Sequence, residues 1–98
     1  MDPLAGSRWS APETVAGFVQ SAPNQTLLRF AGEERRRSTT HRLLDLGCGA
    51  ARNALPLTQS GWNVLGLDLS LPMLHAARRR ALDAAVEARL HVALAPMD

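Results

Sequence analysis

The sequence contains no lysine, a single cysteine and no long apolar stretch. All eleven basic residues among its 98 are arginines, and the formal net charge is only +2. The lone Cys48 excludes an internal disulfide and fits a reducing compartment, so we expect a cytoplasmic protein. No apolar run approaches the roughly 18 residues of a membrane-spanning helix. The first residues include an acid and no apolar stretch, so we expect no signal peptide and no membrane contact.

Charge and metal-ligand spacing give little support for nucleic-acid or metal binding. Two arginine runs, residues 35–37 and 78–80, are candidates for a phosphate-binding patch, but such runs more often form solvated helix faces. Because the net charge is also small, a nucleic-acid partner is disfavoured. His41, His75 and His91 share no ligand spacing, so no metal site is predicted.

The most informative stretch lies between residues 42 and 53. A Leu-rich run ends at Asp45, and Gly47 and Gly49 then flank Cys48 before a helical pattern begins. This order predicts a buried strand, a glycine-rich turn and a helix, as in nucleotide-binding crossover units. Glycine permits a turn with positive φ and lets the backbone approach a ligand closely.

Two acids at predicted strand ends indicate which ligand this turn binds. Asp45 would repel a pyrophosphate but attract a ligand that carries an ammonium or sulfonium group. Asp68 ends the second predicted strand, about 20 residues beyond the glycines, where an acid can accept both hydroxyls of an adenosine ribose. Two purely structural alternatives remain open: Asp45 caps the following helix, or Asp68 is a simple turn acid.

The segments Asp45-Leu46-Gly47-Cys48-Gly49 and Gly61–Ser70 resemble the first two motifs of class I S-adenosylmethionine-dependent methyltransferases. Ala51 stands where that family usually has a third glycine. The resemblance covers residues 42–98 and implies S-adenosyl-L-methionine as cofactor. The cofactor-binding residues that it implies are Asp45, Gly47, Gly49, Asp68, Leu69 and Asp98.

In the family, residues at these positions bind different parts of the cofactor. By resemblance, Asp45 attracts the methionine ammonium, Asp68 takes the ribose hydroxyls and Leu69 packs on the adenine. The two glycines bring the backbone against the methionyl and ribose portions. Asp98 is the only acid placed for the adenine amino group, and Arg52 is a further candidate for the methionine carboxylate. No catalytic base or acceptor-binding residue can be named.

Two short amphipathic helices are expected before this segment. Ser10 and Glu13 have the spacing of a capping box, which predicts a first helix, and Asn24 is placed to cap a second one. In the family, such helices lie over the cofactor pocket. Trp9 and Phe18 are therefore either lid residues or apolar anchors of these helices.

The expected fold is α/β, a Rossmann-like doubly wound parallel sheet with only its first three strands present, preceded by N-terminal helices. We expect residues 1–41 to form a helical lid segment and residues 42–98 a partial S-adenosylmethionine-binding domain. A helix capped by Ser70 is predicted to reach about residues 85–88. The Leu-rich first strand would lie at an open sheet edge, which favours self-association or pairing with a C-terminal partner.

The predicted function is S-adenosylmethionine binding as part of a methyltransferase. The methyl acceptor is unidentified, and a small molecule is favoured. Two other classes of protein remain as alternatives. A non-catalytic adenosyl-binding or interaction module would bind the cofactor without transferring a methyl group. An NAD-dependent oxidoreductase would share the fold, but it would prefer an apolar residue in place of Asp45 and a third glycine.

Overall fold

The computed structural model describes residues 1–95, which form one parallel sheet with helices packed against it. The strands are β1 (Arg42–Leu46), β2 (Asn63–Asp68) and β3 (Leu90–Leu94), in the spatial order β1-β2-β3. The helices are α1 (Pro12–Gln20), α2 (Gln25–Arg37), α3 (Ala54–Gln59) and α4 (Leu71–Asp83), with one 3₁₀ turn, η1, at Arg8–Ser10. The predicted α/β class and its parallel sheet with three strands are confirmed.

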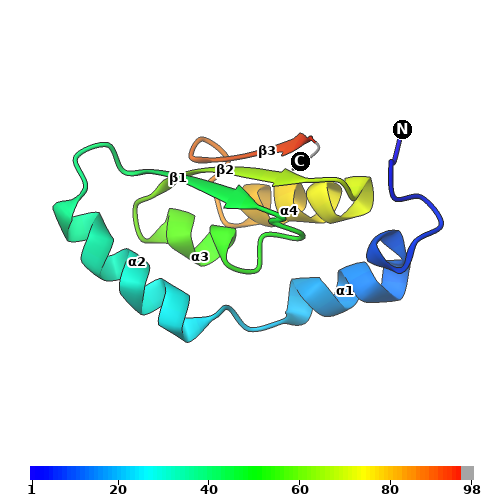
Figure 1. The fold of residues 1–98 in the computed structure, drawn as a ribbon, viewed down its shortest axis with the longest axis horizontal. Coiled ribbons are helices and arrows are strands. Elements are labelled where there is room, and N and C mark those ends of the chain that lie inside the picture. Colours follow the sequence, from blue (N-terminus) through cyan, green and yellow to red (C-terminus); the bar gives the residue numbers. More distant parts are fainter. Residues whose placement is uncertain (96–98) are drawn as a thin grey trace.

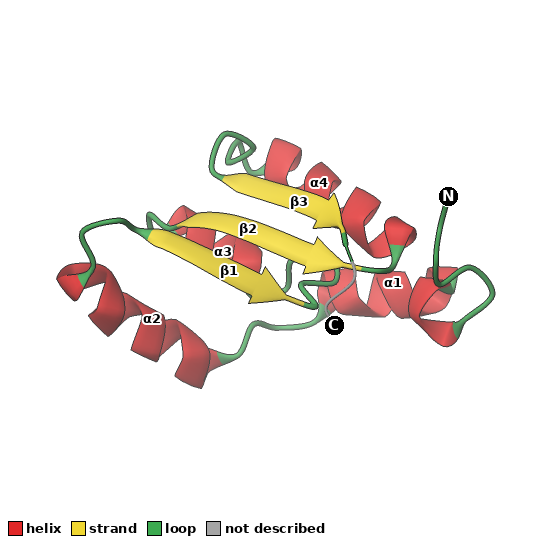
Figure 2. Cartoon of the chain, turned by 45° about the horizontal axis from the view of Figure 1, so that its top comes forward, coloured by secondary structure: helices red, strands yellow, loops and turns green. Residues whose placement is uncertain are grey.

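The helices lie on one side of the sheet (Figure 1). Side chains alternate along each strand, so that Leu43, Val64 and Leu90 face α3 and α4. These strand residues join Leu57 and Trp62 in the core, where Val64 is 1% exposed. α2 packs beside α3, and α1 packs beside α4 near the carboxyl ends of the strands (Figure 2). Within the described residues, no helix has the length and apolar character that crossing a membrane requires.

The opposite face of the sheet is uncovered within residues 1–95. Figure 2 shows this face toward the viewer, with α3 and α4 behind it. Leu44 and Leu46 of β1 are 56% and 57% exposed, and the neighbouring Leu65 of β2 is 43% exposed. β1 also lies at the edge of the described sheet, as predicted. Parallel sheets usually have both faces covered, so this face and edge are unusual surfaces for a free domain.

The helix caps agree only in part with the sequence pattern. Asn24 caps α2 as predicted, because its side chain accepts a hydrogen bond from Leu27 N (3.1 Å). The predicted capping box at Ser10 is wrong, since α1 has Ala11 as its N-cap and no side-chain cap. The Ser10 hydroxyl instead bonds the Ser70 hydroxyl (2.8 Å), and Ser70 caps α4 as predicted.

α4 ends at Asp83, before the predicted range of residues 85–88. Ala85 has the left-handed φ of 58°, and its N–H donates to Leu82 O (3.1 Å). The N–H of Val86 donates to Ala81 O (2.9 Å). These two bonds form a Schellman motif, which normally has glycine in the left-handed position. The sequence pattern missed the helix end because alanine occupies that position.

Candidate site at the carboxyl ends of the first two strands

The turn after β1 has the glycine-dependent conformation that the sequence predicted. Gly47 and Gly49 have φ values of 70° and 54°, in the left-handed region that favours glycine. The N–H groups of Gly47 and Cys48 both donate to Leu67 O, at 2.7 and 3.0 Å. These bonds hold the turn against the end of β2. The parallel register then places Asp45 of β1 beside β2, at the same sheet end as Asp68.

Ala51, at the third-glycine position, also has a left-handed backbone. Its φ is 66°, and its side chain is fully buried. A left-handed conformation costs a residue other than glycine roughly 1–2 kcal/mol. Burial of the methyl group offsets about 0.8 kcal/mol of that cost. The turn therefore keeps a glycine-type backbone even though the residue is alanine.

Asp68 connects the glycine turn to the start of α4. Its Oδ2 accepts a hydrogen bond from Gly49 N (2.8 Å), and its Oδ1 accepts one from Ser70 N (2.9 Å). Each carboxylate oxygen has a second lone pair, so both can also accept bonds from ligand hydroxyls. Asp68 is therefore more than a simple turn acid, because it orders two loops and keeps free acceptor capacity.

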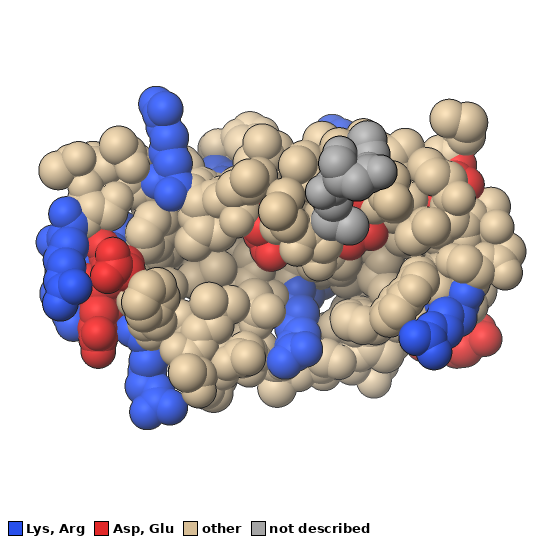
Figure 3. Space-filling view, viewed as in Figure 1, with Lys and Arg blue, Asp and Glu red and all other residues tan. Residues whose placement is uncertain are grey.

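Asp45 lies in a very different environment. Its carboxylate is half-buried and accepts no hydrogen bond from any residue between 1 and 95. Burial, and after it the negative charge of Asp68, raises the pKa of the Asp45 carboxyl above its ordinary value of 3.8. The capping alternative is wrong, since the N-cap of α3 is Asn53 and it makes no side-chain cap bond. In the view of Figure 3, acidic atoms lie near the middle of the molecule, apart from the arginines at the end of α2.

Cys48 is buried against β2 and takes no part in the chemistry expected of the site. Burial, together with the charges of Asp45 and Asp68, raises the pKa of its thiol to about 12. A thiol that stays protonated is a poor nucleophile and metal ligand. A Cβ added at Gly66 would lie 2.7 Å from Cys48 Sγ, so β2 needs a glycine there. The described residues contain no group of three metal-ligating side chains.

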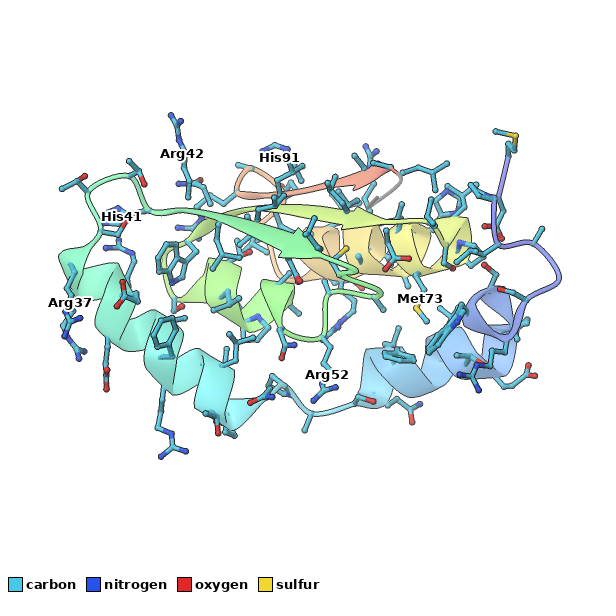
Figure 4. The ribbon with its side chains drawn as sticks, in the orientation of Figure 1. Arg37, His41, Arg42, Arg52, Met73 and His91 are labelled. Carbon is cyan, nitrogen blue, oxygen red and sulfur yellow. The ribbon has the colours of Figure 1, made fainter. Side chains whose placement is uncertain are left out.

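A pocket of about 420 Å³ adjoins Asp68 and the glycine turn. Three of its residues, Leu4, Trp9 and Phe18, come from the N-terminal segment, and the ring centroids of Trp9 and Phe18 are 6.2 Å apart. Met73 points from α4 toward α1 (Figure 4). Asp45 is not part of this wall. The lining residues are Leu4, Trp9, Phe18, Gly47, Gly49, Asp68, Leu69, Ser70 and Met73.

Two arginines near the glycine turn, Arg80 and Arg52, each donate a hydrogen bond to a main-chain oxygen. Arg80 was expected to point outward with its neighbours, but its Nη1 donates to Ala50 O (2.8 Å), and burial lowers its pKa. Arg52 donates from Nε to Ala22 O (2.6 Å) and points away from the sheet (Figure 4). Asp98, the candidate for the adenine amino group, lies outside the described residues.

Comparison with known proteins identifies relatives that match most of the chain. A family model described as a methyltransferase domain matches residues 43–97. The 23S rRNA (uracil(1939)-C(5))-methyltransferase RlmD of Shewanella sediminis (strain HAW-EB3) is 32% identical over 76 residues. This match covers 76% of the chain and 17% of that relative.

Solved structures with the same fold include several methyltransferases. The glycopeptide N-methyltransferase MtfA has a TM-score of 0.64 and 28% identity, covering 78% of this chain and 35% of MtfA. CcbJ of Streptomyces caelestis has a TM-score of 0.64 and 27% identity, with 76% and 30% covered. A methyltransferase of Geobacter sulfurreducens in complex with S-adenosyl-L-homocysteine has a TM-score of 0.61 and 22% identity, with 89% and 37% covered. The chain thus spans about a third of each of these structures and under a fifth of the rRNA methyltransferase.

Proposed function

The chain belongs to the class I S-adenosylmethionine-dependent methyltransferase family, and from this premise we propose that it binds S-adenosylmethionine as the cofactor-binding part of a methyltransferase. The main support for the proposal is the half-buried carboxylate of Asp45, which accepts no hydrogen bond from residues 1–95. Burying a charge without a partner is costly, and the cost falls when a cation binds beside it. An ammonium or sulfonium group next to the glycine turn supplies that cation.

Residues of the glycine turn and of the end of β2 hold the rest of the cofactor. Asp68, already oriented by two backbone N–H groups, accepts the ribose hydroxyls with its remaining lone pairs. Leu69 packs on the adenine, and Gly47 and Gly49 bring the backbone close to the methionyl and ribose portions. Asp98 remains the candidate for the adenine amino group. When bound, the cofactor supplies a sulfonium methyl group, and these residues fix its position relative to the acceptor.

The oxidoreductase alternative is distinguished by the charge at Asp45. A dinucleotide would place its pyrophosphate at this turn, where a carboxylate repels it. Calorimetric titration with S-adenosylmethionine, S-adenosylhomocysteine and NAD⁺ tests the proposal directly. We expect saturable binding of S-adenosylmethionine and no measurable binding of NAD⁺. Tighter binding of NAD⁺ would contradict the proposal.

The acceptor that we favour is a small molecule. MtfA acts on a glycopeptide by its name, and the pocket wall beside Asp68 is largely apolar and aromatic. RlmD acts on rRNA by its name, so RNA is the second candidate. The arginine runs give RNA limited support. Arg35 bonds His41, Arg80 bonds Ala50 O, and Arg37 pairs with Glu34.

The uncovered face and edge of the sheet are proposed to bind a second copy of the chain or a C-terminal partner. Leu44 and Leu46 expose apolar surface beside the open edge of β1, and unpaired strand edges readily associate. Without such a partner we expect no methyl transfer and a cytoplasmic protein of marginal stability. Sedimentation velocity, combined with a methyl-transfer assay on small-molecule and RNA acceptors, tests this. A stable monomer with turnover would refute it.

A further inference from the structure

Arg80, in the last turn of α4, holds a main-chain group of the glycine turn. Its Nη1 donates to Ala50 O at 2.8 Å. The Arg80 side chain is partly buried, and no carboxylate of residues 1–95 forms a salt bridge with it. The bond to Ala50 O therefore gives a partly desolvated cation an acceptor. Hydrogen bonds with a charged donor are among the stronger ones in proteins.

This bond acts on the peptide group that joins Ala50 to Ala51. The atoms of a peptide group lie in one plane, so holding Ala50 O also fixes the N–H of Ala51 and restricts its φ. That φ is 66°, a value that costs free energy in any residue other than glycine. Burial of the Ala51 methyl group offsets only part of this cost. The bond from Arg80 supplies a further contribution, which a glycine at position 51 would not need.

A second peptide group connects this one to the cofactor site. The N–H of Ala51 donates to Cys48 O (3.0 Å), and Cys48 O belongs to the same peptide plane as Gly49 N. Gly49 N in turn donates to Asp68 Oδ2 (2.8 Å). Two peptide planes and three hydrogen bonds therefore connect the Arg80 guanidinium to the acid that we assign to the ribose. A change in the orientation of the Ala50–Ala51 peptide would be transmitted to that acid.

We propose that Arg80 is a positioning residue for the cofactor site, which replaces the missing third glycine by holding residues 47–51 in the conformation that binds the cofactor. The inference rests on the proposed function. Arg80 does not line the pocket beside Asp68, so it acts through the backbone and not by contact with the ligand. Burial and the charge of Asp68 raise the pKa of Asp45, and no opposing effect of Arg80 accompanies them. The conformation of the turn is therefore what Arg80 controls.

Residue-resolved hydrogen–deuterium exchange in the ligand-free protein tests this control. Arg80→Met keeps the apolar stem and removes the hydrogen bond, so we expect the amides of residues 47–51 to exchange about tenfold faster. The amides of residues 64–67 in β2 should be unchanged, which separates opening of the turn from a general loss of stability. Arg79→Met is the matched control, because Arg79 is exposed and pairs with Asp83. Equal exchange of the turn in wild type and Arg80→Met overturns the proposal. If Arg80→Met does not fold, Arg80→Gln, whose side chain is shorter by two atoms, serves for the same comparison.

Calorimetric binding of S-adenosylhomocysteine then tests whether Arg80 replaces a glycine. A protein whose competent conformation is only partly populated binds more weakly by that fraction. We expect Ala51→Gly alone to leave the affinity unchanged, Arg80→Met to weaken it about tenfold, and the double variant to recover most of the loss. Weaker binding that Ala51→Gly does not restore overturns the proposal but leaves the proposed function intact. No binding to the wild type overturns the proposed function, while the exchange comparison still decides whether Arg80 holds the turn.

Discussion

Replacing Asp45 by asparagine should make the ligand-free protein more stable and its binding of S-adenosylmethionine weaker. The substitution preserves the shape of the side chain and removes its charge. In the free protein that charge is half-buried, close to Asp68, and has no hydrogen-bond donor within residues 1–95. In the complex the same charge attracts the cationic part of the cofactor. The two effects therefore have opposite signs, which a simple loss of structure cannot produce.

The pH dependence of the stability effect follows from the direction of the pKa shift. Because the folded-state pKa of Asp45 is raised above 3.8, this group contributes stability that is fully present below pH 3.8. That contribution is lost as pH rises through the raised folded-state pKa. The stability difference between Asp45→Asn and wild type should therefore be near zero in acid and grow toward neutral pH. For binding, loss of an interaction with a charged group costs about 1.5–3 kcal/mol, which is roughly a ten- to hundredfold weaker affinity.

Denaturant unfolding of both proteins between pH 3 and pH 7, with calorimetry at pH 7, measures these effects. Glu13→Gln is a suitable control, since Glu13 is an exposed acid in the first turn of α1. It should change neither the pH profile nor the affinity. Loss of stability at neutral pH in Asp45→Asn, or unchanged affinity for S-adenosylmethionine, would refute this reasoning.

Two further substitutions test the structure around the site. Asp68→Ala removes two backbone hydrogen bonds to a partly buried carboxylate, so we expect a loss of about 2–4 kcal/mol in unfolding free energy as well as weaker cofactor binding. Asp83→Ala is its control, since it loses only an exposed ion pair with Arg79, and a similar loss there would contradict the prediction. Gly66→Ala places a Cβ 2.7 Å from Cys48 Sγ and 2.9 Å from its Cβ, which should cost about 1–3 kcal/mol in thermal unfolding. Adding Cys48→Ala removes only the closer atom, so it should restore part of the loss; full stability of Gly66→Ala alone would show that β2 shifts to make room.

Local patterns in the sequence were sufficient for most of the fold. The Leu-rich run, the two glycines and the strand-ending acid predicted β1, the turn and β2, because each depends on neighbouring residues and on a simple alternation. Ser70 was recognised as the cap of α4 for the same reason. The position of β1 at the sheet edge also followed, since it depends only on strand order.

Features that depend on distant residues were not predictable from those patterns. Ser10 has the spacing of a capping box, but its hydroxyl bonds Ser70, which is 60 positions away in the sequence. The need for glycine at position 66 arises from Cys48, which meets it only when β1 and β2 pair in their observed register. The end of α4 was missed because Ala85 adopts a conformation that its residue type disfavours.

The two acids of the site illustrate this limit most clearly. Asp45 is the penultimate residue of β1 and Asp68 is the last residue of β2, so sequence reasoning gave both of them the same two interpretations, a cofactor ligand or a purely structural acid. Backbone N–H groups satisfy Asp68 even without a ligand, so its substitution changes folding and binding together. Asp45 has no such donor within residues 1–95, and its charge opposes folding until a cation binds. Asp45 is therefore the residue at which a change in binding can be separated from a loss of structure.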